Sequence, residues 1–172
     1  MNAQSAVQLQ LGMWHNVTDG MVAECSNEVL NSGVEGATVT SIASIYAHMV
    51  WSEDMITNGM LQGKPLIYQS AGWEAKTGVT FPGQSPEMNP DWANALKMDF
   101  PKFQEYAKEV YAATDAFLNN VSEADLERKV QTPLGEQTLG WGIAMLLGTH
   151  FPQHAGEIAA LKGVHGMRGL PF

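Results

Sequence analysis

Apolar side chains recur at every third or fourth position in several long stretches of the chain, which is the spacing of amphipathic helices. The four longest of these stretches cover residues 4–30, 42–60, 99–119 and 138–162. No segment alternates apolar and polar residues over the length that a sheet strand requires. The pattern therefore predicts an all-α fold, a four-helix bundle, in a single domain spanning residues 1–172.

The helical spacing is lost between residues 61 and 89, the predicted long loop between helices 2 and 3. Glycine and proline recur through this segment, and no helical period remains. A loop of this length in a compact domain is usually functional or disordered. Its aromatic and aliphatic residues favour a packed segment that covers the mouth of a site, with Trp73 as the expected ligand contact. The alternative is a segment that only closes the end of the bundle.

Several local signals set the expected ends and bends of the elements. Asn89-Pro90 predicts a short helix that ends near Lys97, and Asp99 is a candidate cap for the third long helix. The stretch 129–135 reads as a connector with a turn. Pro152 predicts a kink in the last helix, and Gly163 is a plausible end for it.

Two histidines interrupt the apolar stripe of the last predicted helix. His150 and His154 are four residues apart, so they lie on one helix face. A buried imidazole needs a hydrogen-bond partner or a metal, because an unsatisfied one costs about 1–3 kcal/mol. The pair therefore indicates either two metal ligands or two core histidines bonded to neighbouring carbonyls or carboxylates.

His48 lies at the edge of the apolar stripe of the second predicted helix. Side chains from facing helices build metal sites in bundle cores, so His48 can converge with His150 and His154. Three imidazoles leave a four-coordinate metal one open position for water or substrate. Zinc, nickel and iron(II) all accept imidazole, and we expect zinc or nickel. Glu157, one turn beyond His154, is the alternative candidate for a ligand, or a base that contacts a ligand and not the metal.

Composition narrows the classes of function. The net charge of −9 among 172 residues argues against binding to nucleic acid or to an anionic membrane surface. No apolar run approaches the roughly 20 residues that span a bilayer. The beginning of the chain lacks the features of a secretory signal, and the single cysteine, Cys25, suits a reducing compartment. We therefore expect a cytoplasmic protein with neither nucleic-acid nor membrane partners.

The order of several short motifs resembles the DinB/YfiT-like superfamily. These motifs are Asp125-Leu126, Thr132-Pro133-Leu134-Gly135-Glu136, and the apolar helix that holds His150, His154, Gly156 and Ile158. His48 matches the first histidine of that family. The resemblance covers nearly the whole chain and implies a four-helix bundle, usually a homodimer, with a three-histidine site for a divalent metal. Glu157 departs from the family pattern, which often has glutamine there.

The resemblance also implies an activity. Characterised members of the family include S-transferases that use low-molecular-weight thiols and a thiol-dependent maleylpyruvate isomerase. We therefore expect a metal-dependent enzyme that acts with a small thiol on an electrophilic substrate, although no catalytic residue is assigned. Two alternatives stay open: a metal-dependent hydrolase, since a metal also activates water, and a non-catalytic, stress-related metal-binding protein.

Overall fold

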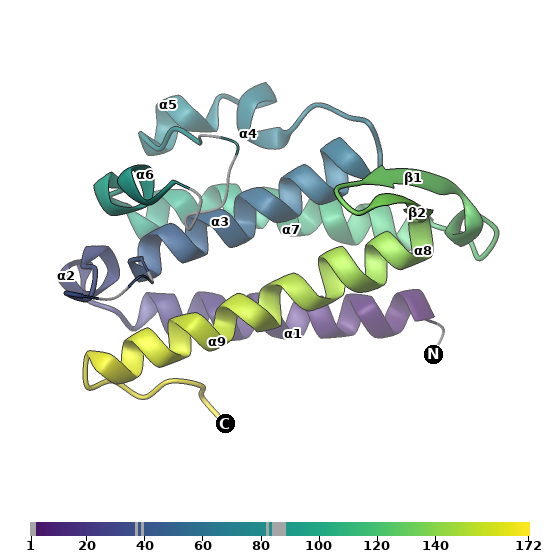
Figure 1. The fold of residues 1–172 in the computed structure, drawn as a ribbon. Coiled ribbons are helices and arrows are strands. Elements are labelled where there is room, and N and C mark those ends of the chain that lie inside the picture. The colour runs from purple at the N-terminus through teal and green to yellow at the C-terminus, as the bar shows by residue number, and fades with distance from the viewer. Residues whose placement is uncertain (1–2, 37, 39, 82, 84–88) are drawn as a thin grey trace.

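The computed structural model of the chain describes residues 3–36, 38, 40–81, 83 and 89–172 (Figure 1). It is mostly helical, as predicted, and four long helical segments lie side by side. The segments are α1 (Ala3–Ala23), α3 (Ile42–Asp54) with η1 (Met55–Met60), α7 (Phe100–Asn120), and α8 (Leu139–Trp141) with η4 (Gly142–Leu147) and α9 (Gly148–Val164). Helices α1 and α3 each pack against both α7 and α9.

The expectation of an entirely helical chain is wrong at residues 129–138, which form a small antiparallel hairpin. Its strands are β1 (Lys129–Thr132) and β2 (Gly135–Thr138), with Thr132 paired to Gly135. The turn was predicted, and Gly135 supports it because its φ of 94° suits glycine. The strands escaped prediction because each has only four residues and only Val130 is buried.

The first predicted helix is shorter than expected. Helix α1 ends at Ala23 instead of continuing to residue 30, and a separate helix, α2 (Asn27–Asn31), follows. Ser26 explains the break, since its side chain accepts a hydrogen bond from the Val29 amide and so starts a new helix. The other predicted caps, Asn89 for α6 (Pro90–Ala95) and Asp99 for α7, are confirmed. The stretch before β1 adds a single turn, η3 (Asp125–Glu127).

The segment from 61 to 89 contains two short helices, α4 (Ile67–Ser70) and α5 (Trp73–Thr77), which the sequence did not reveal. Asp54, a fully buried residue at the end of α3, holds this segment in place. Its carboxylate accepts hydrogen bonds from the amides of Ile67 and Tyr68 at 3.0 and 2.9 Å, and from the Tyr106 hydroxyl at 2.9 Å. A buried carboxylate is tolerated because these donors replace its water. Asp54 therefore ties α4 to both α3 and α7.

The helix that carries His150 and His154 continues through Pro152 as predicted. Proline has no amide hydrogen for the carbonyl four residues earlier, which belongs to Gly148. The Gln10 side chain on α1 donates to that carbonyl at 2.9 Å, so the carbonyl keeps a partner. The helix ends at Val164, two residues beyond the predicted Lys162, so Gly163 lies inside the helix and the prediction that it caps the helix is wrong. The left-handed residue that follows is Gly166, with φ of 74°.

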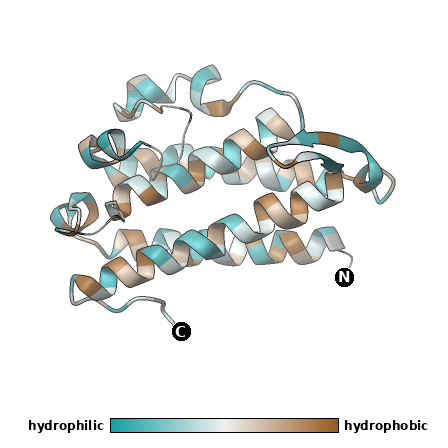
Figure 2. Ribbon diagram, viewed as in Figure 1, coloured by the Kyte–Doolittle hydropathy of each residue, from teal (hydrophilic) through white to brown (hydrophobic). Residues whose placement is uncertain are grey.

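Hydrophobic and hydrophilic residues mix along each long helix (Figure 2), as expected of amphipathic helices. The larger buried cluster joins α3, α7 and the middle of α9 with the segment from α4 to Val79, and a smaller one lies toward the hairpin. The two π-helical segments, η1 and η4, contact each other. A Cβ at Gly142 would lie 2.9 Å from Leu61 Cδ2, so a larger residue at this position would require the Leu61 side chain to shift. None of the described helices is long and apolar enough to cross a membrane.

Candidate metal site

The structure brings His48, His150 and His154 together between α3 and α9. One ligand atom of each imidazole lies within 4.8 Å of the others, and the ring centroids are 4.6–5.0 Å apart. His48 comes from α3, and the other two come from successive turns of α9. The spacing of four residues puts the α9 pair on one face, and the packing of α3 against α9 supplies the third ring.

The closest approach within this group fits shared coordination of one ion. His48 Nε2 and His150 Nε2 are 3.2 Å apart. Two nitrogen ligands of a tetrahedral zinc, each about 2.0–2.1 Å from the metal, are separated by about 3.3 Å. All three side chains are partly buried, so the group is also reachable from outside. The residues present therefore fit a divalent metal with three imidazole ligands and room for a further one.

The Nδ1 atoms of the three histidines have different surroundings. His154 Nδ1 lies 2.7 Å from Glu157 Oε2, and His48 Nδ1 lies 3.3 Å from the Ser52 hydroxyl. Partners of this kind fix the ring orientation and leave Nε2 for a metal. The buried Nδ1 of His150 has no hydrogen-bond partner among the described residues. Sequence reasoning identified Glu157 but missed Ser52, for which the signal was its place four residues after His48.

His150 is kept neutral by its surroundings. Burial lowers its pKa to about 3, and the neighbouring His154 and His48 add to the effect. Burial disfavours the imidazolium because a charge loses its hydration, and a second or third cation nearby would repel it. A neutral imidazole is the form that binds metal. The protein thus holds this ligand ready at any pH near neutrality.

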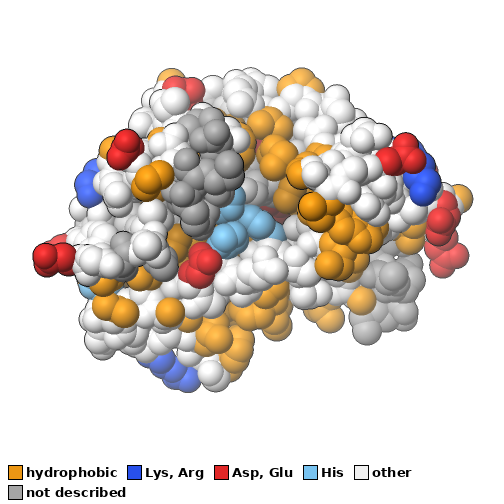
Figure 3. Space-filling model, viewed as in Figure 1, with side chains coloured by type: hydrophobic (Ala, Val, Ile, Leu, Met, Phe, Trp, Pro, Cys, Tyr) orange, Lys and Arg blue, Asp and Glu red, His pale blue; other side chains and the backbone are white. Residues whose placement is uncertain are grey.

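The group of histidines is visible from the molecular surface. Figure 3 shows histidine side chains at the floor of a hollow, with hydrophobic side chains along its right-hand side. Trp51, one turn after His48, stacks on Phe81 with ring centroids 5.1 Å apart. Phe81 thus brings the segment 61–89 onto the α3 helix that holds His48. Residues 82 and 84–88 of this segment lie outside the described part of the chain.

Trp73, the expected ligand contact, packs on α7. Its indole nitrogen donates to Glu109 Oε2 at 2.9 Å, and its ring lies 6.0 Å from that of Tyr106. The side chain is buried, with 7% exposed. Its main contacts are therefore structural ones, and its contribution to ligand binding stays a prediction.

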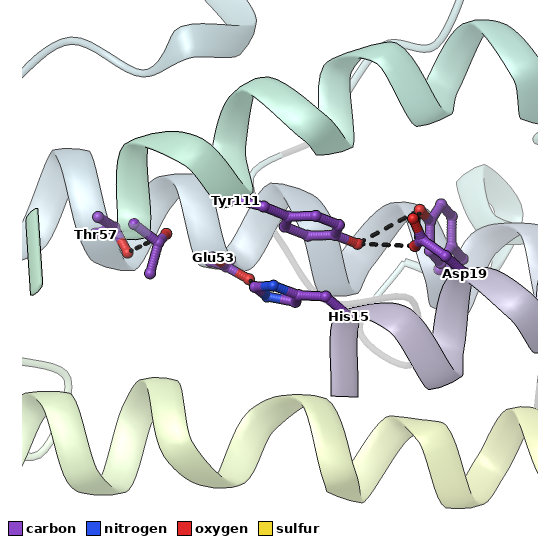
Figure 4. A network of polar contacts seen from close by, with 7 residues as sticks. His15, Asp19, Glu53, Thr57 and Tyr111 are labelled. Carbon is purple, nitrogen blue, oxygen red and sulfur yellow. Dashed lines mark hydrogen bonds and ion pairs between the residues drawn. The ribbon is translucent and has the colours of Figure 1, made fainter. Parts of the chain in front are cut away.

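A buried polar network lies between α1, α3 and α7 (Figure 4). His15 Nε2 is 2.8 Å from Glu53 Oε2, and the His15 ring stacks on Tyr111 at 3.7 Å between centroids. The hydroxyls of Tyr46 and Tyr111 both donate to Asp19, at 2.6 and 3.1 Å. The His15 side chain is buried between these helices. His15 and His165 are not members of the metal-ligand group.

Solved structures share this fold. A conserved protein from Enterococcus faecalis has a TM-score of 0.81 at 15% identity, over 96% of this chain and 99% of its own. A DinB-like protein from Bacillus subtilis has a TM-score of 0.63 at 17% identity, over 97% and 96%. Identities this low establish a shared fold only. No curated protein matches the chain.

The family is shown by the sequence itself. The DinB superfamily model matches residues 13–158, which include all three histidines of the group and most of each long helix. This span is well over half of the chain. The expected resemblance is confirmed, and the chain belongs to the DinB superfamily.

Proposed function

We propose that His48, His150 and His154 bind one divalent metal, zinc or nickel in preference to iron, and that the protein is a metal-dependent S-transferase or isomerase that uses a low-molecular-weight thiol. The observation that carries the proposal is the 3.2 Å separation of two Nε2 atoms from different helices, with His154 completing the set. A metal in this position lowers the pKa of a bound thiol and holds it as thiolate.

The residues of the chain have distinct roles in this proposal. Glu157 holds the His154 ring through Nδ1, Ser52 does the same for His48, and burial keeps His150 neutral. In the transferase reaction the thiol loses its proton, its sulfur bonds to the electrophilic carbon, and the leaving group departs with its electron pair. Glu157 is the proposed acceptor of that proton. The product is a thioether.

A thiol titration followed by a transfer assay tests this function. The protein is loaded with cobalt(II) or nickel(II), and small thiols such as cysteine and glutathione are added while the absorption spectrum is recorded. We expect a thiolate-to-metal charge-transfer band, followed by thioether formation with chlorodinitrobenzene. A band without turnover would favour the non-catalytic metal-binding alternative. Ester hydrolysis that needs metal but no thiol would favour the hydrolase, and absence of the band would contradict thiol binding at the metal.

The remaining structural expectations belong to the same proposal. The four long segments form a four-helix bundle of DinB type, with the segment 61–89 as the long connection, and the whole of residues 1–172 is one domain. The proposed assembly is a cytoplasmic homodimer, with no nucleic-acid or membrane partner. The exposed side chains of Leu9 and Met13 on α1 offer apolar area for such an interface. Light scattering at micromolar concentration should give the dimer mass, and a monomer mass would contradict it.

A further inference from the structure

A cavity distinct from the hollow above the histidines lies toward the hairpin end of the molecule. Its volume is about 610 Å³, within the range of small-molecule sites. Its walls come from η1 and the residues after it, the second half of α7, and the segments on either side of the hairpin. Asn58, which lines the cavity, follows His48 by ten residues of continuous helix, or about 15 Å. The cavity is therefore separate from the histidine group.

One wall of this cavity, here called its floor, is formed by apolar residues at the end of α7. Ala113, Ala116 and Phe117 line it at spacings of three and four residues, which place them along one helix face, and Val121 follows directly after the helix. Two of these are alanines, whose short side chains leave a hollow between the helix and its neighbours. Leu139 adds an apolar wall from the start of α8. An apolar group of a few carbons would lose its contact with water here.

The rim carries two cations whose heads are held in place. Lys64 Nζ donates to Gln62 Oε1 at 2.7 Å, and Arg128 Nη2 donates to the Leu61 carbonyl at 3.0 Å. An ammonium has three donors and a guanidinium has five, so each keeps donors for a ligand after these bonds. The chain has only nine lysines and arginines against eighteen acidic residues. Two of those nine cations therefore line one cavity of a strongly acidic protein.

One acidic residue, Asp125, also lines the cavity, but its carboxylate is engaged elsewhere. It accepts hydrogen bonds from the Ser122 hydroxyl and amide, at 2.6 and 2.8 Å. These bonds lower the pKa of Asp125, so it is ionised at neutral pH and its charge is offset in part by Arg128. The charge balance of the rim still favours an anion, with two cations against one carboxylate.

We propose that this cavity binds a small organic carboxylate, with its carboxylate between Lys64 and Arg128 and its apolar tail on Ala116 and Phe117. Charge-assisted hydrogen bonds to both cations supply the head-group recognition, and the α7 floor supplies the contact for the tail. The π-helical turn of η1 shapes one wall, and such turns are frequent at functional sites. The site is independent of the metal proposal, since it shares no residue with the histidine group.

The test uses three six-carbon probes that differ only in head group: hexanoate, hexanol and hexylamine. Each is titrated into the isotope-labelled full-length protein, and amide resonances are followed by NMR. We expect hexanoate to shift the side-chain amides of Gln62 and Asn120 and the backbone amides of Ala113 and Ala116. If hexanol binds as tightly as hexanoate, the cavity does not recognise the carboxylate. If hexylamine binds more tightly than hexanoate, the cavity prefers a cation. Either result would overturn the proposal.

Single substitutions show whether hexanoate binds in this cavity. Lys64→Ala should weaken hexanoate affinity about tenfold, which corresponds to about 1.4 kcal/mol, because the variant loses a charge-assisted hydrogen bond. Arg128→Lys keeps the charge but loses the fork geometry, and should weaken the affinity less than Arg128→Ala does. Lys102→Ala is the matched control, because Lys102 is exposed and pairs with Asp99 at the far end of α7. His154→Ala should leave hexanoate binding unchanged; if it abolishes the shifts, the carboxylate binds at the histidine group and the cavity proposal fails.

Discussion

Glu157 Oε2 lies 2.7 Å from His154 Nδ1, one helical turn further along α9. This contact gives a proposed metal ligand a carboxylate partner, which raises its basicity and fixes its tautomer. The partner of His154 Nδ1 is thus a carboxylate, whereas His48 Nδ1 lies next to the Ser52 hydroxyl. Because the hydrogen-bond partners at Nδ1 differ, we expect the three histidines to contribute unequally to metal affinity.

Replacing Glu157 should weaken metal binding without removing the ligands. We expect Glu157→Ala to raise the metal dissociation constant about 10- to 100-fold, the usual cost of losing such a partner. Glu157→Gln should cost less, because its amide oxygen still accepts from Nδ1. Competition with a chromophoric chelator measures both. Glu105→Gln, at an exposed residue paired with Lys108, is the control, and an equal loss in that variant would mean a non-specific charge effect.

The low pKa of His150 predicts that the metal-free protein loses stability on acidification. His150 stays neutral in the folded chain down to about pH 3, whereas in the unfolded chain it binds a proton below about pH 6.5. The unfolded state therefore gains protons first, and the free energy of unfolding falls as the pH drops from 6.5 toward 3. Between pH 6.5 and 5 we expect His150 to lower the free energy of unfolding by about 1–2 kcal/mol.

Urea unfolding of the metal-free protein at pH 7 and pH 5 measures that effect. His150→Gln removes the titrating group, so the difference between the two pH values should shrink by about 1–2 kcal/mol relative to the wild type. His165→Gln, outside the histidine group, is the matched control. An unchanged difference in His150→Gln would contradict the assignment of His150 as a ring held neutral by burial.

Gln10 should stabilise the protein through the Gly148 carbonyl. Because Pro152 cannot donate to that carbonyl, Gln10→Ala leaves it short of a partner, and we expect a loss of about 1 kcal/mol. In a Pro152→Ala background the new amide can donate to Gly148, so Gln10→Ala should cost less there. Chemical denaturation of the four proteins in this cycle gives the coupling. Additive losses would contradict the link between Gln10 and Pro152.

Asp54 should hold the segment after η1 against the long helices. Its carboxylate accepts hydrogen bonds from the amides of Ile67 and Tyr68, the Tyr106 hydroxyl and the Asn58 side chain. Asp54→Ala leaves several of these buried donors without an acceptor, and we expect the free energy of unfolding to fall by about 3 kcal/mol or more. Limited proteolysis should then cut within residues 61–81. Asp115→Ala, which removes an exposed contact to Gln8, should have little effect, and equal protease resistance of the two variants would contradict the role of Asp54.

The sequence allowed prediction of the features that depend on local spacing. The helical stripes, the caps at Asn89 and Asp99, and the shared face of His150 and His154 all follow from residues near each other in the chain. The approach of His48 to His150 depends on how α3 packs against α9, and it was suggested by the general tendency of bundle cores to build sites and by the family resemblance. The hairpin, α4 and α5 were missed because short elements carry too few residues for a period. The burial of His15 depends on Glu53, a partner 38 residues away.

Metal content after purification and dialysis tests the central claim most directly. Wild type, His48→Ala, His150→Ala, His154→Ala and His165→Ala are measured by elemental analysis, with circular dichroism to establish that each is folded. The account predicts about one divalent metal per chain in the wild type and in His165→Ala, and loss of stoichiometric metal in the other three. Retention of stoichiometric metal by folded His48→Ala or His154→Ala would contradict it, as would loss of metal from His165→Ala.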